Sequence, residues 1–188
     1  MQGDPEDSEM KKAWSLFLFI PVLLVFTAAA CTAGDKSPEA GKTFENPFAY
    51  CKAVGTVDSP GADYTGPKVP ESIAVGLKKA FGSPESTPLD MFKNGTYWRC
   101  MDGKVFACNV GANLPCESKA DVRKEPTGGM NEYCKENAGS DFIPMYVTGH
   151  STVYDWKCDG AAPVAGKQLS EVDSQGYQKN IWYEISQP

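Results

Sequence analysis

One segment in the middle of the chain has apolar residues at the spacing of an amphipathic helix. In PESIAVGLKKAF, residues 70–81, Ile73 and Leu77 lie about one helical turn apart on the same face. Pro70 suits the first turn of a helix, and Gly82 suits its C-terminal cap. The pattern predicts a helix over this segment.

A second, shorter helix is predicted near Gly129–Asn137. It would begin behind Thr127, which can cap it, and Met130 and Cys134 would share one face because they are four positions apart. The remaining apolar runs are rich in aromatic and β-branched residues and are bounded by Gly, Pro and Asn, which is typical of strands. We predict strands at 95–100, 104–110, 143–148, 152–158 and 180–185.

Two predicted strand segments have nearly the same sequence, YWRCMDG at 97–103 and YDWKCDG at 154–160. We call them the first and the second repeated phrase. Residues two apart on a strand share a face, so in each copy the Trp and the Cys point the same way and the cation between them points the other way. We expect each Trp ring to pack beside a disulfide, with Arg99 and Lys157 facing solvent. Six matching positions with a one-residue slip leave open whether this is a true duplication.

The first copy also predicts a register. Asp-Gly favours a two-residue hairpin turn, which places the strands on either side of residues 102–103 opposite one another. Cys100 and Cys108 then lie on different faces and should not bond to each other. The second strand, VFACNV, is apolar at nearly every position, so both of its faces should be covered. The expected pairs are Met101 with Lys104, Cys100 with Val105, Trp98 with Ala107, and Tyr97 with Cys108.

The N-terminal region has the layout of an export signal that begins at Met10. Lys11 and Lys12 precede 18 uncharged residues that end in three alanines before Cys31. The segment FTAAAC resembles a bacterial lipoprotein lipobox, which implies that Cys31 receives the lipid. Residues 1–31 are therefore predicted to be a signal peptide with a lipobox. Cleavage after Ala30, or an uncut and marginal membrane span, are the alternatives, since a span needs about 20 apolar residues.

The number of cysteines supports lipidation. The chain has seven, and an odd number would leave one thiol unpaired in an oxidising compartment. With Cys31 carrying a fatty acyl anchor such as palmitate, six remain for three disulfides, and their connectivity is open among 15 pairings. The disulfide candidates are Cys51, Cys100, Cys108, Cys116, Cys134 and Cys158.

Behind the signal, residues 32–45 are polar and predict a flexible tether, and residues 46–188 are long enough for a single exported globular domain. The predicted fold class is α+β: a small disulfide-stapled domain dominated by antiparallel β-strands with two short helices. The part after the signal carries 16 basic and 20 acidic residues without a basic cluster. This composition argues against nucleic-acid binding.

Little in the sequence indicates catalysis, a metal or a cofactor. The chain has no C-x-x-C pair, and His150 is its only histidine, so we expect no metal site and no cofactor. Ser151 adjoins His150, but neighbours on an extended chain point apart and form no dyad. In NIWYEI, Trp182 falls on the face opposite three apolar neighbours, and an exposed Trp is a common binding anchor. Trp182 is therefore a candidate ligand contact.

These features favour a cell-envelope lipoprotein with a non-catalytic binding or scaffolding domain. Its partners would be the membrane, through the lipid, and an envelope protein or glycan. We expect it on the extracytoplasmic side of a bacterial membrane, in the periplasm or at the cell surface. An exported hydrolase that uses carboxylates or His150 is an alternative.

One further resemblance concerns bacterial inhibitors of C-type lysozyme, which are small exported β-domains. Tyr154, Trp156, Cys158, Asp159 and Gly160 resemble the start of their Y-x-C-x-G motif, and Ser174-Gln175-Gly176-Tyr177 is similar to their inhibitory S-G-x-x-Y loop. The chain departs from the family by the extra Gln175, by Tyr177 directly following Gly176, and by having no Cys after Cys158. The resemblance implies lysozyme inhibition as an alternative function.

Overall fold

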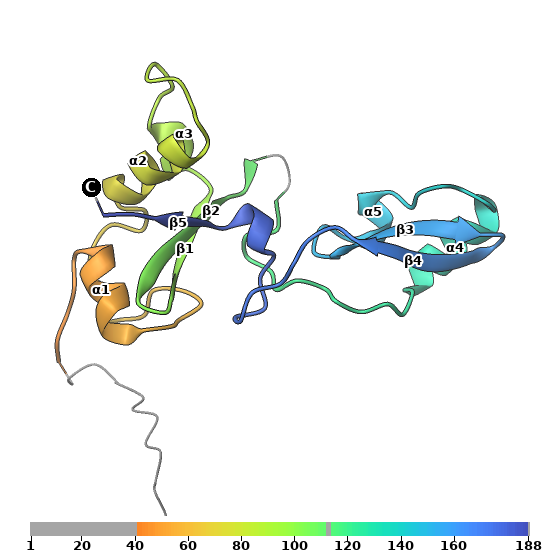
Figure 1. Cartoon of the computed structure of the whole chain (residues 1–188), viewed down its shortest axis with the longest axis horizontal. Helices are drawn as coiled ribbons and strands as arrows, with labels where there is room; N and C mark the ends of the chain where they lie inside the picture. Colours follow the sequence, from red (N-terminus) through yellow and green to blue (C-terminus); the bar gives the residue numbers. More distant parts are fainter. Residues whose placement is uncertain (1–40, 112–113, 188) are drawn as a thin grey trace, which may run out of the picture. The chain divides into compact units, whose positions relative to one another are not determined.

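Two antiparallel sheets organise residues 41–111 and 114–187, the part of the chain that the computed structural model describes (Figure 1). One sheet has three strands in the order β1-β2-β5, and the other is the hairpin β3-β4. With five α-helices in the described residues, the predicted α+β class is confirmed. The predicted signal peptide and the lipidation site at Cys31 lie outside the described residues. The strands are β1 (Thr96–Met101), β2 (Lys104–Asn109), β3 (Tyr154–Asp159), β4 (Ala162–Gln168) and β5 (Tyr183–Ile185).

Both predicted helices form close to their expected limits. They are α2 (Glu71–Ala80) and α4 (Gly128–Glu136), and the Thr127 hydroxyl caps α4 by accepting from the Met130 N–H at 3.3 Å. The helix α1 (Pro47–Val54) was not expected because its apolar periodicity is weak. Its cap is nevertheless strong, since the Asn46 side chain accepts from two main-chain N–H groups at 2.9 and 3.0 Å.

The prediction of a strand at 143–148 is wrong. The segment contains the short helix α5 (Met145–Thr148), with Pro144 at its N-cap and Gly149 at its C-cap with φ 86°. Local capping therefore outweighs the β propensity of Tyr146 and Val147. A further single turn, α3 (Asp90–Lys93), precedes β1, and the predicted strand 180–185 is a 3-10 turn at 179–181 followed by β5.

The register of the first hairpin is confirmed at every predicted pair, from Met101 with Lys104 to Tyr97 with Cys108. The turn residues Asp102 and Gly103 have φ values of 53° and 76°, which a tight hairpin of this hand requires. The strand β4 was missed because Pro163 and Gly166 argue against a strand.

The six predicted cysteines are all paired. The disulfides are Cys51–Cys100, Cys108–Cys116 and Cys134–Cys158, so Cys100 and Cys108 do not bond to each other. One bridge joins α1 to β1, one fastens the segment after β2, and one joins α4 to β3.

Each disulfide lies in its own apolar cluster. Helices α1 and α2 cover one face of the three-stranded sheet, with Val105 and Ala107 of β2 in that core. Cys108 of β2 belongs to a second cluster, with Phe106 packed against it, so both faces of this strand are covered as predicted. A third cluster fills the space between α4 and the β3-β4 hairpin.

The ordered domain begins earlier than residue 46. Phe44, placed in the tether by the sequence, is only 9% exposed, and its main chain pairs with that of Tyr64. The end of the predicted tether is therefore corrected to a point before Phe44. Among residues 41–111 and 114–187, no helix has the length and apolar character needed to cross a membrane.

Candidate functional site

The cation of the first repeated phrase is buried, which corrects the expectation that it faces solvent. Arg99 has no exposed surface, and its guanidinium carbon lies 4.5 Å from the ring centre of Trp182 and 4.6 Å from that of Tyr177. One nitrogen forms an ion pair with Asp173, and another donates to the side chain of Gln175. The far face of β1 is covered by residues 173–182, which no local pattern around residue 99 could reveal.

The second phrase behaves as expected. Trp156 and Cys158 are buried in one cluster with Cys134, and Lys157 is exposed. Trp98 and Cys100 are likewise buried together in the first phrase. The prediction that a Trp packs beside a disulfide is thus confirmed in both copies. The prediction that the cation faces solvent is confirmed only in the second.

Trp182 is not on an exposed face. Only 7% of it is accessible, because its ring packs edge-on against Tyr177 at 5.2 Å between centroids and against Arg99. Trp182 therefore cannot act as a protruding anchor. It still lines a pocket, and its role as a ligand contact stays a prediction.

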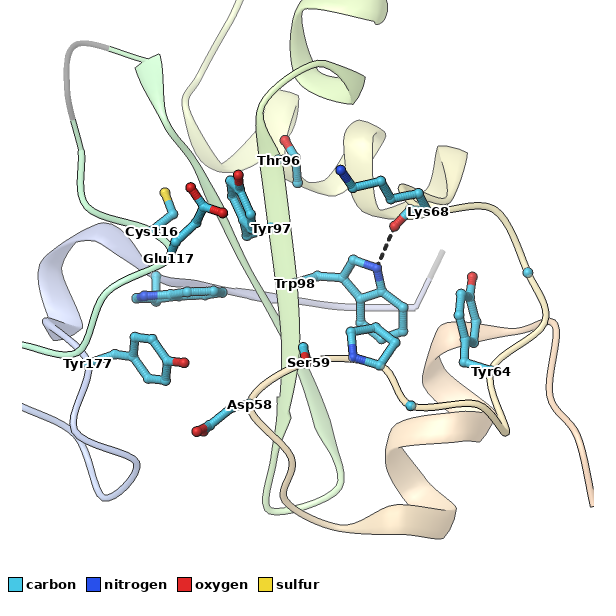
Figure 2. Close-up of a pocket in the computed structure, with 14 residues that line it drawn as sticks. Asp58, Ser59, Tyr64, Lys68, Thr96, Tyr97, Trp98, Cys116, Glu117 and Tyr177 are labelled. Atoms are coloured by element: carbon cyan, nitrogen blue, oxygen red, sulfur yellow. Dashed lines mark hydrogen bonds between the residues drawn. The ribbon is translucent and has the colours of Figure 1, made fainter.

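That pocket, of about 600 Å³, lies beside β1 (Figure 2). Aromatic side chains dominate its wall, together with two carboxylates and one lysine. Figure 2 shows Tyr64, Trp98 and Lys68 on one side of β1 and Tyr97, Glu117 and Tyr177 on the other. The lining residues are Asp58, Ser59, Pro60, Gly61, Tyr64, Gly66, Lys68, Thr96, Tyr97, Trp98, Cys116, Glu117, Tyr177 and Trp182.

A polar chain links the pocket to the buried Arg99. Gln175, which accepts from Arg99, also donates to Asp58 in the pocket wall at 2.9 Å. The other oxygen of Asp58 accepts from Lys119 at 2.6 Å, and this ammonium lies 4.1 Å from the ring centre of Tyr177. The charge of Asp58 is thus held by partners within the domain, which fixes this end of the wall.

Glu117, the other carboxylate of the pocket wall, has a different partner. Its carboxylate interacts with the Tyr97 hydroxyl, and this hydrogen bond raises the pKa of Tyr97 because it stabilises the protonated phenol. In the described ranges 41–111 and 114–187, neither Glu117 nor Lys68 makes an ion pair. The pocket therefore carries one anionic and one cationic side chain that are free to meet a ligand.

Trp98 is anchored within the wall. Its indole N–H donates to the Lys68 carbonyl at 2.8 Å, and its ring meets Tyr64 edge-on at 4.8 Å. This contact also positions the loop that carries Lys68. The sequence predicts Trp98 only as a core residue. It does not predict Tyr64, Asp58 and Glu117 as site residues, because they lie in loops without a motif.

The β3-β4 hairpin borders a second pocket of about 500 Å³. Exposed apolar side chains surround it, including Phe142 at 65% and Leu169 at 64% exposure. Its wall also carries three charged residues, Asp141, Asp155 and Lys157, but it has three aromatic side chains where the pocket beside β1 has five. The pocket beside β1 is therefore the better candidate site.

The loop that resembles the lysozyme inhibitors is packed inward. Tyr177 is only 6% exposed because it lies against Arg99 and Trp182. The loop is braced further by Asp173, whose side chain accepts from the main-chain N–H groups of Gln175 and Tyr177 at 2.9 and 3.0 Å. In this geometry Tyr177 is not offered to an enzyme partner.

No known family model matches the chain, and no curated protein or solved structure is significantly similar to it.

Proposed function

We propose that the protein is a bacterial cell-envelope lipoprotein, anchored through Cys31, whose domain binds a ligand in the pocket beside β1. The pocket is the observation that carries the binding role. Binding sites are typically concave and mostly apolar, with a few polar groups that orient the ligand. The five aromatic side chains and the free charges of Glu117 and Lys68 fit that description.

The anchoring role is supported by the signal layout and by the cysteines. The six cysteines after Cys31 pair with one another, which leaves Cys31 as the one cysteine thiol available for a lipid. A lipid anchor would hold the binding domain at a membrane surface and restrict its ligand to the envelope.

Anchoring is tested by Cys31→Ser. We expect this change to abolish fatty-acid labelling and to move the protein out of the detergent-extracted membrane fraction, because the acyl chain is the only predicted anchor after cleavage. Ser37→Ala is the matched control and should leave both unchanged. A Cys31→Ser protein that stays in the membrane with its N-terminus intact would show a transmembrane anchor instead.

Binding is tested with the full lipidated chain in detergent micelles. Two probes are offered, a proteolytic digest of envelope proteins and soluble muropeptides released from peptidoglycan, and binding is read from tryptophan fluorescence. Ser59→Trp should abolish the response because it fills the pocket from an exposed loop position. Ser86→Trp, equally exposed and outside the pocket, should leave it intact. If neither probe binds the parent protein, or if both variants bind alike, the pocket is not the ligand site.

A further inference from the structure

The main-chain groups of β1 alternate between two directions. In the β1-β2 hairpin, the pair that flanks the two-residue turn is Met101 and Lys104, so odd-numbered residues of β1 bond to β2. Even-numbered residues then point their N–H and C=O groups away from β2. Cys100 confirms this, because its N–H and C=O bond to the C=O and N–H of Val57, both at 3.0 Å.

This outer pairing stops after one step. The next pair along the ladder would join Trp98 to Ser59, but the chain turns away there and continues through Pro60, which has no N–H. Within the described ranges, the main-chain N–H and C=O of Trp98 have no hydrogen-bond partner. Trp98 is only 4% exposed, and buried main-chain groups normally have a partner. The pocket lies at this gap, with Trp98 and Ser59 both in its wall.

In the second phrase, main-chain groups on the outer edge of β3 have hydrogen-bond partners. There both the Trp and the Cys use the outer edge, since the Trp156 carbonyl accepts from the Ile143 N–H at 2.7 Å and the Cys158 N–H donates to the Ser140 carbonyl at 2.8 Å. In the first phrase the Cys is paired and the Trp is not. The difference between the copies is therefore that a chain segment bonds to the outer edge at Trp156 and, within the described residues, none does at Trp98.

We propose that the pocket ligand is an extended polypeptide, which adds a strand to the outer edge of β1 at Trp98, with a basic side chain toward Glu117 and a neighbouring acidic side chain toward Lys68. The proposal rests on the proposed function and specifies its ligand. Strand addition of this kind takes its affinity from main-chain hydrogen bonds and its specificity from alternate side-chain pockets.

The arrangement of the wall fits a strand better than other ligands. Neighbouring side chains of a strand point to opposite faces, and the pocket has one aromatic wall and one free charge on each side of β1 (Figure 2). Glu117 and Lys68 have opposite signs, so a peptide with adjacent basic and acidic residues complements both. Trp98 offers one N–H and one C=O, which is the pattern that a polypeptide main chain satisfies.

The test uses a library of short random peptides displayed on phage, selected on the full lipidated chain in micelles and counter-selected on Ser59→Trp. We expect sequences with adjacent basic and acidic residues. A synthetic peptide from the selection is then N-methylated at one position at a time. Methylation of residues of one parity should weaken binding about tenfold, since it removes a main-chain donor, and methylation of the other parity should not. Equal sensitivity at all positions would overturn strand addition.

Two readouts on the protein complete the test. Amide exchange of Trp98 should slow about tenfold when the peptide binds, because its N–H gains a partner, while the amide of Cys100 is already bonded and should not change. Glu117→Lys should weaken the same peptide about tenfold by placing like charges together, and Glu125→Lys, exposed and outside the pocket, should not. An unchanged Trp98 amide, or equal effects of the two charge reversals, would contradict the proposal.

The outcome also separates this inference from the proposed function. If muropeptides bind and Ser59→Trp abolishes their binding, but no peptide is selected, the pocket is a ligand site and the peptide inference is wrong. If neither muropeptides nor peptides bind, both are wrong.

Discussion

The two repeated phrases differ most on the side that the sequence treats as equivalent. In both, a Trp and a disulfide-bonded Cys are buried in an apolar cluster. The cation between them is buried in the first phrase, at Arg99, and exposed in the second, at Lys157. A strand pattern thus fixes which residues share a face. What covers each face depends on distant segments of the chain.

The covering segment explains the choice of cation. Arg99 lies among the rings of Tyr177 and Trp182 and pairs with Asp173, and a planar guanidinium can stack on rings and bond to a carboxylate together. Lys157 has no such cover and can remain hydrated. The same short pattern therefore occurs in β1, where both faces of the strand are covered, and in β3, where the face that carries Lys157 is exposed.

The largest expected effect tests what the copies share. Trp98→Ala and Trp156→Ala should each lower the free energy of unfolding by ~3–5 kcal/mol, because each empties a large core site. Denaturant unfolding with the disulfides intact measures this. Tyr146→Ala removes an aromatic ring that is 81% exposed and should change stability by less than about 0.5 kcal/mol. If one Trp variant unfolds like the parent protein, the two phrases do not share a packing role.

The next effect tests where the copies differ. Arg99→Ala should cost about 3 kcal/mol, because it leaves the carboxylate of Asp173 buried without its partner. Lys157→Ala should cost less than about 0.5 kcal/mol. The same unfolding measurements compare the two variants.

A double variant separates the charge from the packing around it. Arg99→Met with Asp173→Asn removes both charges and keeps a side-chain oxygen that can accept from the main-chain N–H groups of Gln175 and Tyr177, so it should recover most of the stability that Arg99→Ala loses. If Arg99→Ala and Lys157→Ala have the same small effect, the cover over Arg99 contributes nothing to stability.

Local patterns account for what could be predicted from the sequence. The hairpin register followed from Asp102-Gly103 alone, because a two-residue turn fixes every pair after it. Helices α2 and α4 followed from periodicity and caps, and the set of paired cysteines followed from parity. Each of these depends on residues close together in the sequence or on a simple count.

The candidate site could not be predicted in this way. Its wall joins Tyr64, Trp98, Glu117 and Trp182, which lie far apart in the chain and share no motif. The burial of Arg99 depends on Asp173, 74 residues away. The strand predicted at 143–148 failed for a different reason, since apolar β-branched and aromatic residues on a capped single turn look like a strand.

The smallest effect concerns the residue before each Trp, which is Tyr97 in the first phrase and Asp155 in the second. The hydrogen bond to Glu117 raises the pKa of Tyr97 above its ordinary value near 10. Glu117→Ala should lower that pKa, because it removes the carboxylate that stabilises the protonated phenol. NMR of carbon-labelled tyrosine rings during a pH titration measures the shift, with Glu136→Ala on α4 as the control.

The same pKa shift predicts the direction of the pH dependence. A phenol whose pKa is raised by folding stabilises the protein below the pKa of the unfolded chain, and this contribution is lost as the pH rises through the folded value. The parent protein should therefore lose stability relative to Glu117→Ala only at pH above ~10. A Tyr97 pKa that is unchanged in Glu117→Ala would mean that Glu117 is not held by Tyr97. Glu117 would then lack the fixed position beside β1 from which it meets a basic side chain.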